Sequence, residues 1–352
     1  MKTIAVIKTI RMIVLNLNFI EVVMEFQNNY KNRIFSIQNQ NFDELALELY
    51  RHQSVENPIY RQYHELLGID FLKIDNIARI PYLPIEFFKT HQVLCKNCTV
   101  DLIFESSGTS GMQRSKHYIH DQELYKSSFF TGFELFFGKP GEYVFVFLLP
   151  GYLENKSSSL LYMAKYLADG SKYHEIKFYL NDFEKLFNDL QVLKNNDEKI
   201  FLWGLTSALV DFFSNYKLDL NDTVILETGG MKGRKPELTR KEVHTIISKG
   251  SGVDYVYSEY GMTELLSQAY SMGNGLFNTV PWMKVLIRDM NDPFNILDQN
   301  ETGCINIIDL ANIYSCAFIA TDDIGRIFPD QSFEVTGRMD NSVLRGCNLM
   351  SF

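Results

Sequence analysis

The sequence predicts an α/β fold in which a mainly parallel sheet is flanked by helices and joined to a smaller β-rich lobe. Strand-length apolar runs alternate with helix-length stretches from residue 143 to about residue 270, an order that requires crossover connections between parallel strands. The run from Tyr143 to Leu149 is apolar throughout, as in a strand buried on both faces. Beyond residue 270, short strands divided by Asn, Asp and Gly indicate the β-rich lobe.

Prolines and one capping residue mark the elements along the chain. Pro58 divides the apolar pattern of residues 42–67 into two helices, and Pro81 and Pro84 fix an extended turn before a short helix. Asp121 is placed to cap a further helix. That helix is expected over residues 122–137, with others over 158–168, 182–193, 207–215 and 235–248; strands are expected over 101–105, 143–149, 175–179, 200–204, 223–228, 252–257, 284–288, 303–308 and 315–320.

Composition bounds the class of protein. The 352 residues are enough for two domains, or for one large domain with a satellite. With 46% hydrophobic and 22% charged residues, the chain is neither disordered nor a small disulfide scaffold. A net charge of −9 and the lack of a dense basic run argue against a nucleic-acid partner. Five cysteines, an odd number, favour a reducing compartment, and we expect the cytoplasm.

The domain boundaries follow from these patterns. We expect residues 1–23 to be an over-extended gene start or a loose segment; a signal peptide is the alternative, but polar residues interrupt its apolar run and no transmembrane segment is expected. Residues 24–270 would form the α/β core and 271–340 the β-rich lobe of the same domain. Residues 341–352 would form a short tail.

The most informative motif is a Ser/Gly loop that follows the strand at 101–105. Glycines let a backbone approach a ligand closely, and hydroxyl groups beside free amides suit a polyphosphate. Composition alone leaves a flexible surface turn equally open, but α/β sheets bind ligands at the carboxyl ends of their strands. The loop matches neither a P-loop nor a GxGxxG fingerprint. Its residues are Ser106, Ser107, Gly108, Thr109, Ser110 and Gly111.

A second motif is the segment Tyr257 to Glu264, expected just after a strand. Tyr260 is suited to stacking on a base, Gly261 to a turn, Thr263 to a phosphate and Glu264 to Mg²⁺. The segments Thr321 to Arg326 and Thr336 to Asp340 are further candidates, and Arg345 to Asn348 closes the chain. Taken singly, each of these segments is typical of a surface turn.

In this order the motifs resemble the adenylate-forming superfamily, which includes acyl-CoA synthetases, luciferase and peptide-synthetase adenylation domains. The Ser/Gly loop is similar to its phosphate loop, and residues 260–264 to its Tyr-Gly-x-Thr-Glu motif. Residues 322–326 are similar to its ribose-binding motif, and residues 337–340 to its hinge. Gly229 and Gly230 stand where that superfamily has a segment that contacts adenine. The resemblance implies a large adenylate-forming domain, spanning residue 101 to the end.

Within that superfamily the sequence most resembles the acyl-protein synthetases of the LuxE type, which activate fatty acids for a reductase. Larger superfamily members have about 100 further residues after the hinge, forming a lid with a catalytic lysine, whereas this chain stops 12 residues after Asp340. We therefore expect the lid to be absent or minimal. The basic residue after the phosphate loop is also displaced, to the segment Met112 to Lys116. The resembling residues are 57–60, 80–85, Ser115, Lys116, 227–234 and 345–348.

The resemblance implies ATP-dependent activation of a carboxylic acid, expected to be a fatty acid, as acyl-AMP. Asp323 and Arg338 would bind ribose, and Mg²⁺ would neutralise phosphate charge. Cys347 stands where the acyl-protein synthetases carry the acyl-accepting cysteine, so a protein thioester and a reductase partner are implied. Two alternatives stay open: transfer to coenzyme A or another carrier, and a nucleotide-binding partner protein without turnover.

The remaining patterns give weaker predictions of function. Cys95 and Cys98 have the spacing of half a zinc site, with ordinary thiols as the alternative. The histidines form no HExxH pattern, and no Gly-x-Ser-x-Gly elbow exists, which disfavours a serine hydrolase. Phenylalanines at 129–137, with Phe145 and Phe147, are expected in the core, although an acyl-binding slot would need similar walls.

Overall fold

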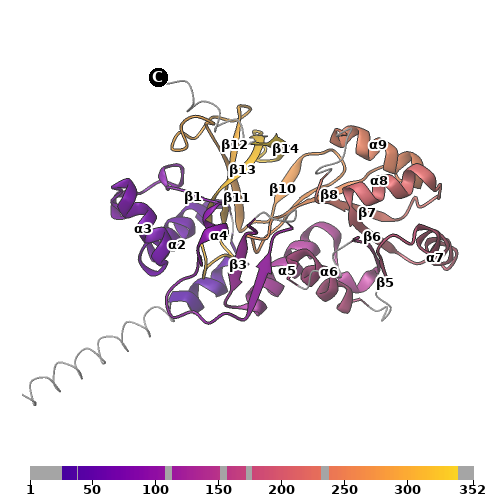
Figure 1. Cartoon of the computed structure of the whole chain (residues 1–352), viewed down its shortest axis with the longest axis horizontal. Helices are drawn as coiled ribbons and strands as arrows, with labels where there is room; N and C mark the ends of the chain where they lie inside the picture. Colours follow the sequence, from indigo (N-terminus) through magenta and orange to yellow (C-terminus); the bar gives the residue numbers. More distant parts are fainter. Residues whose placement is uncertain are drawn as a thin grey trace, which may run out of the picture.

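A computed structural model describes residues 26–37, 39–107, 113–150, 157–171, 177–230 and 238–339. Their strands form one twelve-stranded sheet and a separate two-stranded sheet. Figure 1 shows the helices α2 and α3 toward one end of the molecule and α7, α8 and α9 toward the other. None of the helices in these ranges is both long enough and apolar enough to cross a bilayer.

Two helices near the N-terminus meet at Pro58, as the sequence predicts. After helical residues 26–34, α2 spans Phe42–Glu56 and α3 spans Pro58–Leu67. The side chain of Asn57 accepts hydrogen bonds from the first amides of α3, and Gly68 ends that helix in the left-handed conformation at φ 66°. Short 3₁₀ helices lie at Asn39–Asn41, Phe71–Lys73 and Ile77–Arg79.

The proline segment and the hairpin that follow lead into the sheet. The strand β1 (Leu83–Pro84) pairs in parallel with β13, and α4 (Phe87–Thr90) follows. The strands β2 (Leu102–Glu105) and β3 (Lys116–Ile119) form the separate antiparallel pair. Asp121 caps α5, whose bounds Gln122–Phe137 equal the predicted ones.

One half of the large sheet is parallel, in the order β8, β7, β6, β4, β5. Each connection between its strands carries a helix, as predicted from the alternating pattern. A 3₁₀ helix at Pro140–Glu142 precedes it. The elements are β4 (Val144–Leu148), α6 (Ser159–Asp169), β5 (Lys177–Tyr179), α7 (Phe183–Asn195), β6 (Ile200–Leu205), α8 (Thr206–Asn215), β7 (Val224–Thr228), α9 (Arg240–Ser251) and β8 (Tyr257–Tyr260).

The other half of the same sheet is antiparallel, in the order β11, β12, β13, β14, β10, β9, and it joins the parallel half at β8. The fold is therefore mixed α/β, with the β-rich region hydrogen-bonded directly to the parallel strands. The elements are β9 (Ala269–Ser271), β10 (Phe277–Thr279), β11 (Met283–Arg288), β12 (Thr302–Asp309), β13 (Phe318–Ile327) and β14 (Phe333–Arg338).

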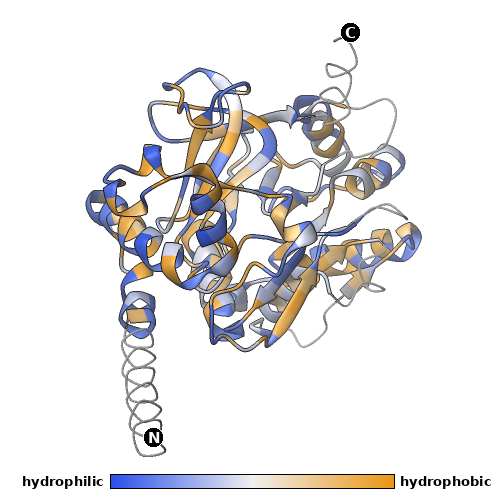
Figure 2. Cartoon of the chain, turned by 60° about the vertical axis from the view of Figure 1, so that its left-hand side comes forward, coloured by the Kyte–Doolittle hydropathy of each residue, from blue (hydrophilic) through white to orange (hydrophobic). Residues whose placement is uncertain are grey.

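The parallel half is covered on both faces, as the apolar run of β4 predicts. Phe145 and Phe147 belong to a cluster that includes residues of α5 and α6, whereas Val144 and Val146 belong to a cluster with residues of α7, α8 and α9. Alternate side chains of one strand therefore serve two cores. Figure 2 shows hydrophobic residues concentrated along the sheet and on the inner sides of its helices.

Two predicted strands lie elsewhere in the structure. The strand expected over residues 252–257 is wrong, because Gly252 adopts φ 77° and ends α9, and β8 begins only at Tyr257. The strand expected over 315–320 begins only at Phe318 and continues to Ile327. The segments 321–326 and 336–338 are consequently strand residues, not surface turns.

Candidate functional site

Three predicted nucleotide-binding residues meet where β8, β13 and β14 lie close together. Tyr260 ends β8, and its hydroxyl donates a hydrogen bond to Asp323 Oδ2 at 2.8 Å. Asp323 pairs in register with Arg338 of the neighbouring strand. The guanidinium of Arg338 lies 3.6 Å from Asp322 Oδ2 and 4.0 Å from Asp323 Oδ1. This corner therefore presents a phenol, two carboxylates and a half-exposed cation.

The two glycines after β7 form an open backbone cradle beside this corner of the sheet. Gly229 and Gly230 have φ angles of 85° and 64°, a conformation that side chains disfavour. The amide of Gly230 donates to Thr206 Oγ1 at 3.1 Å, which fixes the turn. Among the described residues, no atom beyond those of its chain neighbours lies within 4 Å of the place that a Cβ at Gly230 would occupy. A planar ring could therefore approach the backbone there.

The start of the Ser/Gly loop is tied to Glu264. The amide of Ser106 donates to Ser115 O and the amide of Ser115 donates to Ser106 Oγ, both at 3.0 Å. Burial raises the pKa of Glu264, and a side-chain hydrogen bond with Ser115 partly offsets this. The loop and this buried carboxyl are thus held together. Ser107 is exposed at the end of β2. Gly108, Thr109, Ser110 and Gly111 lie outside the described residues.

A buried histidine links Thr263 and Glu264 to the rest of the sheet. His117 Nδ1 lies 2.9 Å from Thr263 O, and its Nε2 lies 3.1 Å from Asn312 Oδ1. The side-chain amide nitrogen of Asn312, Nδ2, donates to Glu264 O at 2.9 Å. Burial lowers the pKa of His117 to about 4, so the ring is neutral at pH 7. The sequence motifs contain neither His117 nor Asn312, because nothing in their local spacing marks them.

A side chain at Gly261 would displace the carboxyl of Glu259. A Cβ at this position would lie 2.5 Å from Glu259 Oε1, so that side chain would have to shift. Burial, opposed by a hydrogen bond from the Thr228 hydroxyl and assisted by the charge of Glu227, raises the pKa of Glu259 to about 7. The carboxyl of Glu259, which titrates near neutral pH, therefore packs against the turn after Tyr260. Sequence reasoning assigned no role to Glu259.

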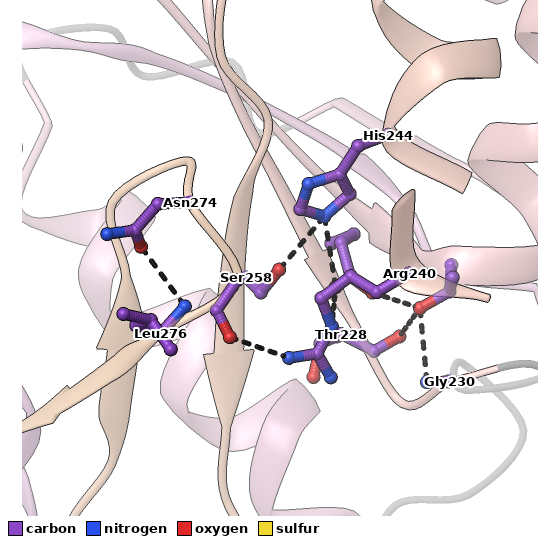
Figure 3. Close-up of polar contacts among 10 residues, drawn as sticks. Thr228, Gly230, Arg240, His244, Ser258, Asn274 and Leu276 are labelled. Atoms are coloured by element: carbon purple, nitrogen blue, oxygen red, sulfur yellow. Dashed lines mark hydrogen bonds and ion pairs between the residues drawn. The ribbon is translucent and has the colours of Figure 1, made fainter. Parts of the chain in front are cut away.

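A polar cluster lies beside the cradle (Figure 3). His244 of α9 points toward Ser258 of β8, with Nε2 and Oγ 3.2 Å apart. Glu227 lies 3.7 Å from His244 Nε2 and 3.9 Å from Arg240 Nε. Burial alone would raise the pKa of Glu227, but the bond from His244 and the charge of Arg240 hold it below its usual range. Glu227 thus remains an anion that anchors α9 to the strand before the glycines.

The described residues offer no complete set of protein ligands for a metal ion. No group of three or more His, Cys, Asp or Glu side chains in those ranges gathers as a metal site. Mg²⁺ in nucleotide sites typically takes one or two protein carboxylates and completes its shell with phosphates and water. Glu264 beside Ser106 and Ser115 fits that mode. Cys347 lies outside the described residues.

Comparison with known proteins shows the fold. No model of a protein family matches the chain, and no curated protein matches it. Among solved structures, an open form of a 2-hydroxyisobutyryl-CoA ligase in complex with 2-HIB-AMP and CoA is similar with a TM-score of 0.67 and 14% identity, over 88% of this chain and 78% of the ligase.

Two further ligases are similar over a smaller share of their length. ATP-bound MatB from Rhodopseudomonas palustris has a TM-score of 0.51 and 16% identity, over 68% of this chain and 48% of MatB. The long-chain-fatty-acid-CoA ligase FadD1 from Archaeoglobus fulgidus has a TM-score of 0.51 and 15% identity, over 71% and 54%. This chain thus spans about half the length of both. The predicted α/β fold is confirmed, and it is the fold of these ligases.

Proposed function

We propose that the chain adenylates a carboxylic acid, as the adenylate-forming superfamily does. One observation carries the proposal: the hydrogen-bonded pair of Tyr260 and Asp323 lies at the same sheet corner as the Gly229 and Gly230 cradle. Base, ribose and phosphate each need a different chemistry, and this corner supplies a ring, a carboxylate and a glycine turn with space beside its backbone. Similar folds holding ATP in MatB, and 2-HIB-AMP in the 2-hydroxyisobutyryl-CoA ligase, support it.

Each predicted residue has a part in that reaction. A carboxylate oxygen of the acid attacks the α-phosphorus of ATP, the bond from that phosphorus to the bridging oxygen breaks, and pyrophosphate leaves. Rate enhancement would come from positioning and charge neutralisation. Ser106 to Gly111 would hold the β- and γ-phosphates, and Thr263 the α-phosphate. Tyr260, Gly229 and Gly230 would hold the base, and Asp323 and Arg338 the ribose.

Glu264 would be the metal ligand. Mg²⁺ would neutralise the phosphate charge that develops as pyrophosphate departs. Burial disfavours the charged form of Glu264, so the carboxylate is poised to gain from a cation. His117 and Asn312 would position Glu264 and Thr263 through their backbone carbonyls.

The acyl acceptor would be a protein thiol, with Cys347 as its position. Burial raises the pKa of all four described cysteines, to about 11 for Cys98 and about 12 for Cys316, so they are poor nucleophiles. Arg345 stands two residues before Cys347 and would favour its thiolate. The resemblance to LuxE-type synthetases points the same way, and implies a fatty acid and an acyl reductase as partner. The odd number of cysteines favours a reducing compartment such as the cytoplasm.

Coenzyme A is the second candidate acceptor, because similar structures are CoA ligases and one holds CoA. The two candidates differ in where the acyl group ends. After incubation with ATP, Mg²⁺ and labelled fatty acid, a protein acceptor leaves label on the chain, whereas coenzyme A leaves it in a small molecule.

Exchange of labelled pyrophosphate into ATP tests the first half-reaction. Short, long and aromatic acids are screened in parallel, with a control that lacks acid. Exchange that depends on one class of acid is expected. If none of the acids promotes exchange above the control, the chain does not adenylate these substrates and the proposal fails.

A further inference from the structure

A cavity of about 410 Å³ lies between the N-terminal segment and the antiparallel half of the sheet, next to the nucleotide corner, with which it shares Asp322. Consecutive residues of a strand point to opposite faces of the sheet. Asp322 therefore faces this cavity, while its neighbour Asp323 accepts the hydrogen bond from Tyr260 on the other face. Its volume falls within the range of small-molecule sites. The walls come from α3, β1, β11, β13 and the loop after β11; they are Tyr63, Tyr82, Pro84, Glu86, Arg288, Pro293, Phe294, Ala320, Asp322 and Met339.

One end of the cavity holds a buried cation. Arg288 is 8% exposed, and its guanidinium donates to three neutral acceptors: Ile305 O and Asn306 Oδ1 through Nη1, and Thr321 O through Nη2. A guanidinium has five N–H groups, so these bonds leave two for a ligand. Among the described residues no carboxylate lies within ion-pair distance of Arg288. Asp322 and Glu86 act on Arg288 only from beyond ion-pair distance, so a directly bonded anionic ligand group would further offset the cost of burying the guanidinium.

A pair of carboxyl groups lies at the same end. Glu86 and Asp322 are hydrogen-bonded, and burial together with Asp322 raises the pKa of Glu86. Glu86 Oε1 is buried and has no hydrogen-bond partner among the described residues. The charged groups around the pair are Arg288, Lys89, whose Nζ lies 3.9 Å from Glu86 Oε1, and Arg338, 3.6 Å from Asp322 Oδ2. A ligand ammonium would bring a positive charge to this pair and donate a hydrogen bond to Glu86 Oε1.

The rest of the lining is apolar or aromatic. Tyr82, Phe294 and Met339 supply the larger surfaces, and Ala320 leaves space between them. A ligand that fits must therefore carry an anion, a cation close to it and a short apolar body.

We propose that this cavity binds a small ammonium carboxylate with an apolar body, the chemistry of an apolar α-amino acid. The carboxylate would accept from the two remaining N–H groups of Arg288, the ammonium would donate to Glu86 and Asp322, and the apolar body would pack against Tyr82 and Phe294. The site does not depend on the adenylation proposed above, although it shares Asp322 with the corner formed by Tyr260, Asp323 and Arg338.

Calorimetric titration of the full chain tests the site. The probes are L-phenylalanine, 3-phenylpropionate, which lacks the ammonium, and 2-phenylethylamine, which lacks the carboxylate. Phenylalanine is expected to bind with a dissociation constant of about 1 mM or lower, and each single-charge probe at least about tenfold more weakly. Binding of either single-charge probe as tight as that of phenylalanine would mean that the cavity selects one charge, and would overturn the proposal.

Two variants locate the binding. Ala320→Leu fills the cavity, and Glu86→Gln keeps its size but removes the anion; each should weaken phenylalanine binding at least about tenfold. Glu134→Gln, an exposed carboxyl on α5, is the matched control and should bind as wild type does. Circular dichroism and ATP titration check folding; if Ala320→Leu misfolds, Glu86→Gln carries the test. Absent binding up to about 10 mM, or wild-type affinity in the folded variants, refutes the site.

Discussion

Glu259 offers a prediction whose size follows from the structure. Burial raises its pKa from 4.5 to about 7, whereas the unfolded chain would titrate it near 4.5. A pKa raised in the folded state contributes stability that is full below about pH 4.5 and is lost as pH rises through about 7. At about 1.4 kcal/mol per pKa unit, the loss at pH 8 is on the order of 3 kcal/mol.

The substitution Glu259→Gln removes this titration and keeps an acceptor for the Thr228 hydroxyl. The variant should match wild type near pH 4.5 and exceed it at pH 8 by up to about 3 kcal/mol, which corresponds to a higher unfolding temperature by on the order of 5 °C. Thermal unfolding of both proteins across this pH range measures the difference, with Glu134→Gln as the exposed control. A variant that is no more stable than wild type at pH 8, or equally stabilised at every pH, refutes the reasoning.

Three further variants probe the proposed reaction. Glu264→Gln removes one anionic ligand for Mg²⁺ and should lower acid-dependent pyrophosphate exchange about 10²-fold; unchanged kinetics would exclude Glu264 as the metal ligand. The double variant of Gly108→Ala and Gly111→Ala should weaken ATP binding in calorimetry, because added Cβ atoms obstruct phosphate; normal affinity would make the loop a surface turn. Cys347→Ser should abolish hydroxylamine-sensitive acyl label and keep exchange, and label that persists would move the acceptor elsewhere.

The elements that could be predicted from the sequence are those whose signals are local. The helix α5 begins after the cap Asp121 and ends at Gly138, so both of its ends were readable. The strand β4 is buried on both faces, and its apolar run is therefore unbroken.

The sequence-based bounds of the strands β8 and β13 were wrong because these strands lack a local signal. Ser258 and Glu259 in one, and Asp322 and Asp323 in the other, are polar residues whose partners lie on other elements: α9, β7, β14 and β8. A polar stretch with a glycine has the composition of a turn, and only the neighbouring strands make it a strand.

The supports of the site could not be predicted in the same way. His117 meets Thr263 across 146 positions and Asn312 across 195, so no motif or periodicity connects them. The cavity beside Arg288 likewise draws residues from distant segments, and its shape exists only after packing.

Transfer of a labelled oxygen tests acid adenylation most directly. In the proposed step the acid's oxygen bonds to the α-phosphorus, and that bond is retained when the acyl group leaves for a thiol. An acid with ¹⁸O in its carboxylate should therefore give AMP that carries one ¹⁸O, detected by mass spectrometry, along with unlabelled pyrophosphate. AMP or ADP without ¹⁸O, formed while the acid is consumed, would contradict adenylation at this site.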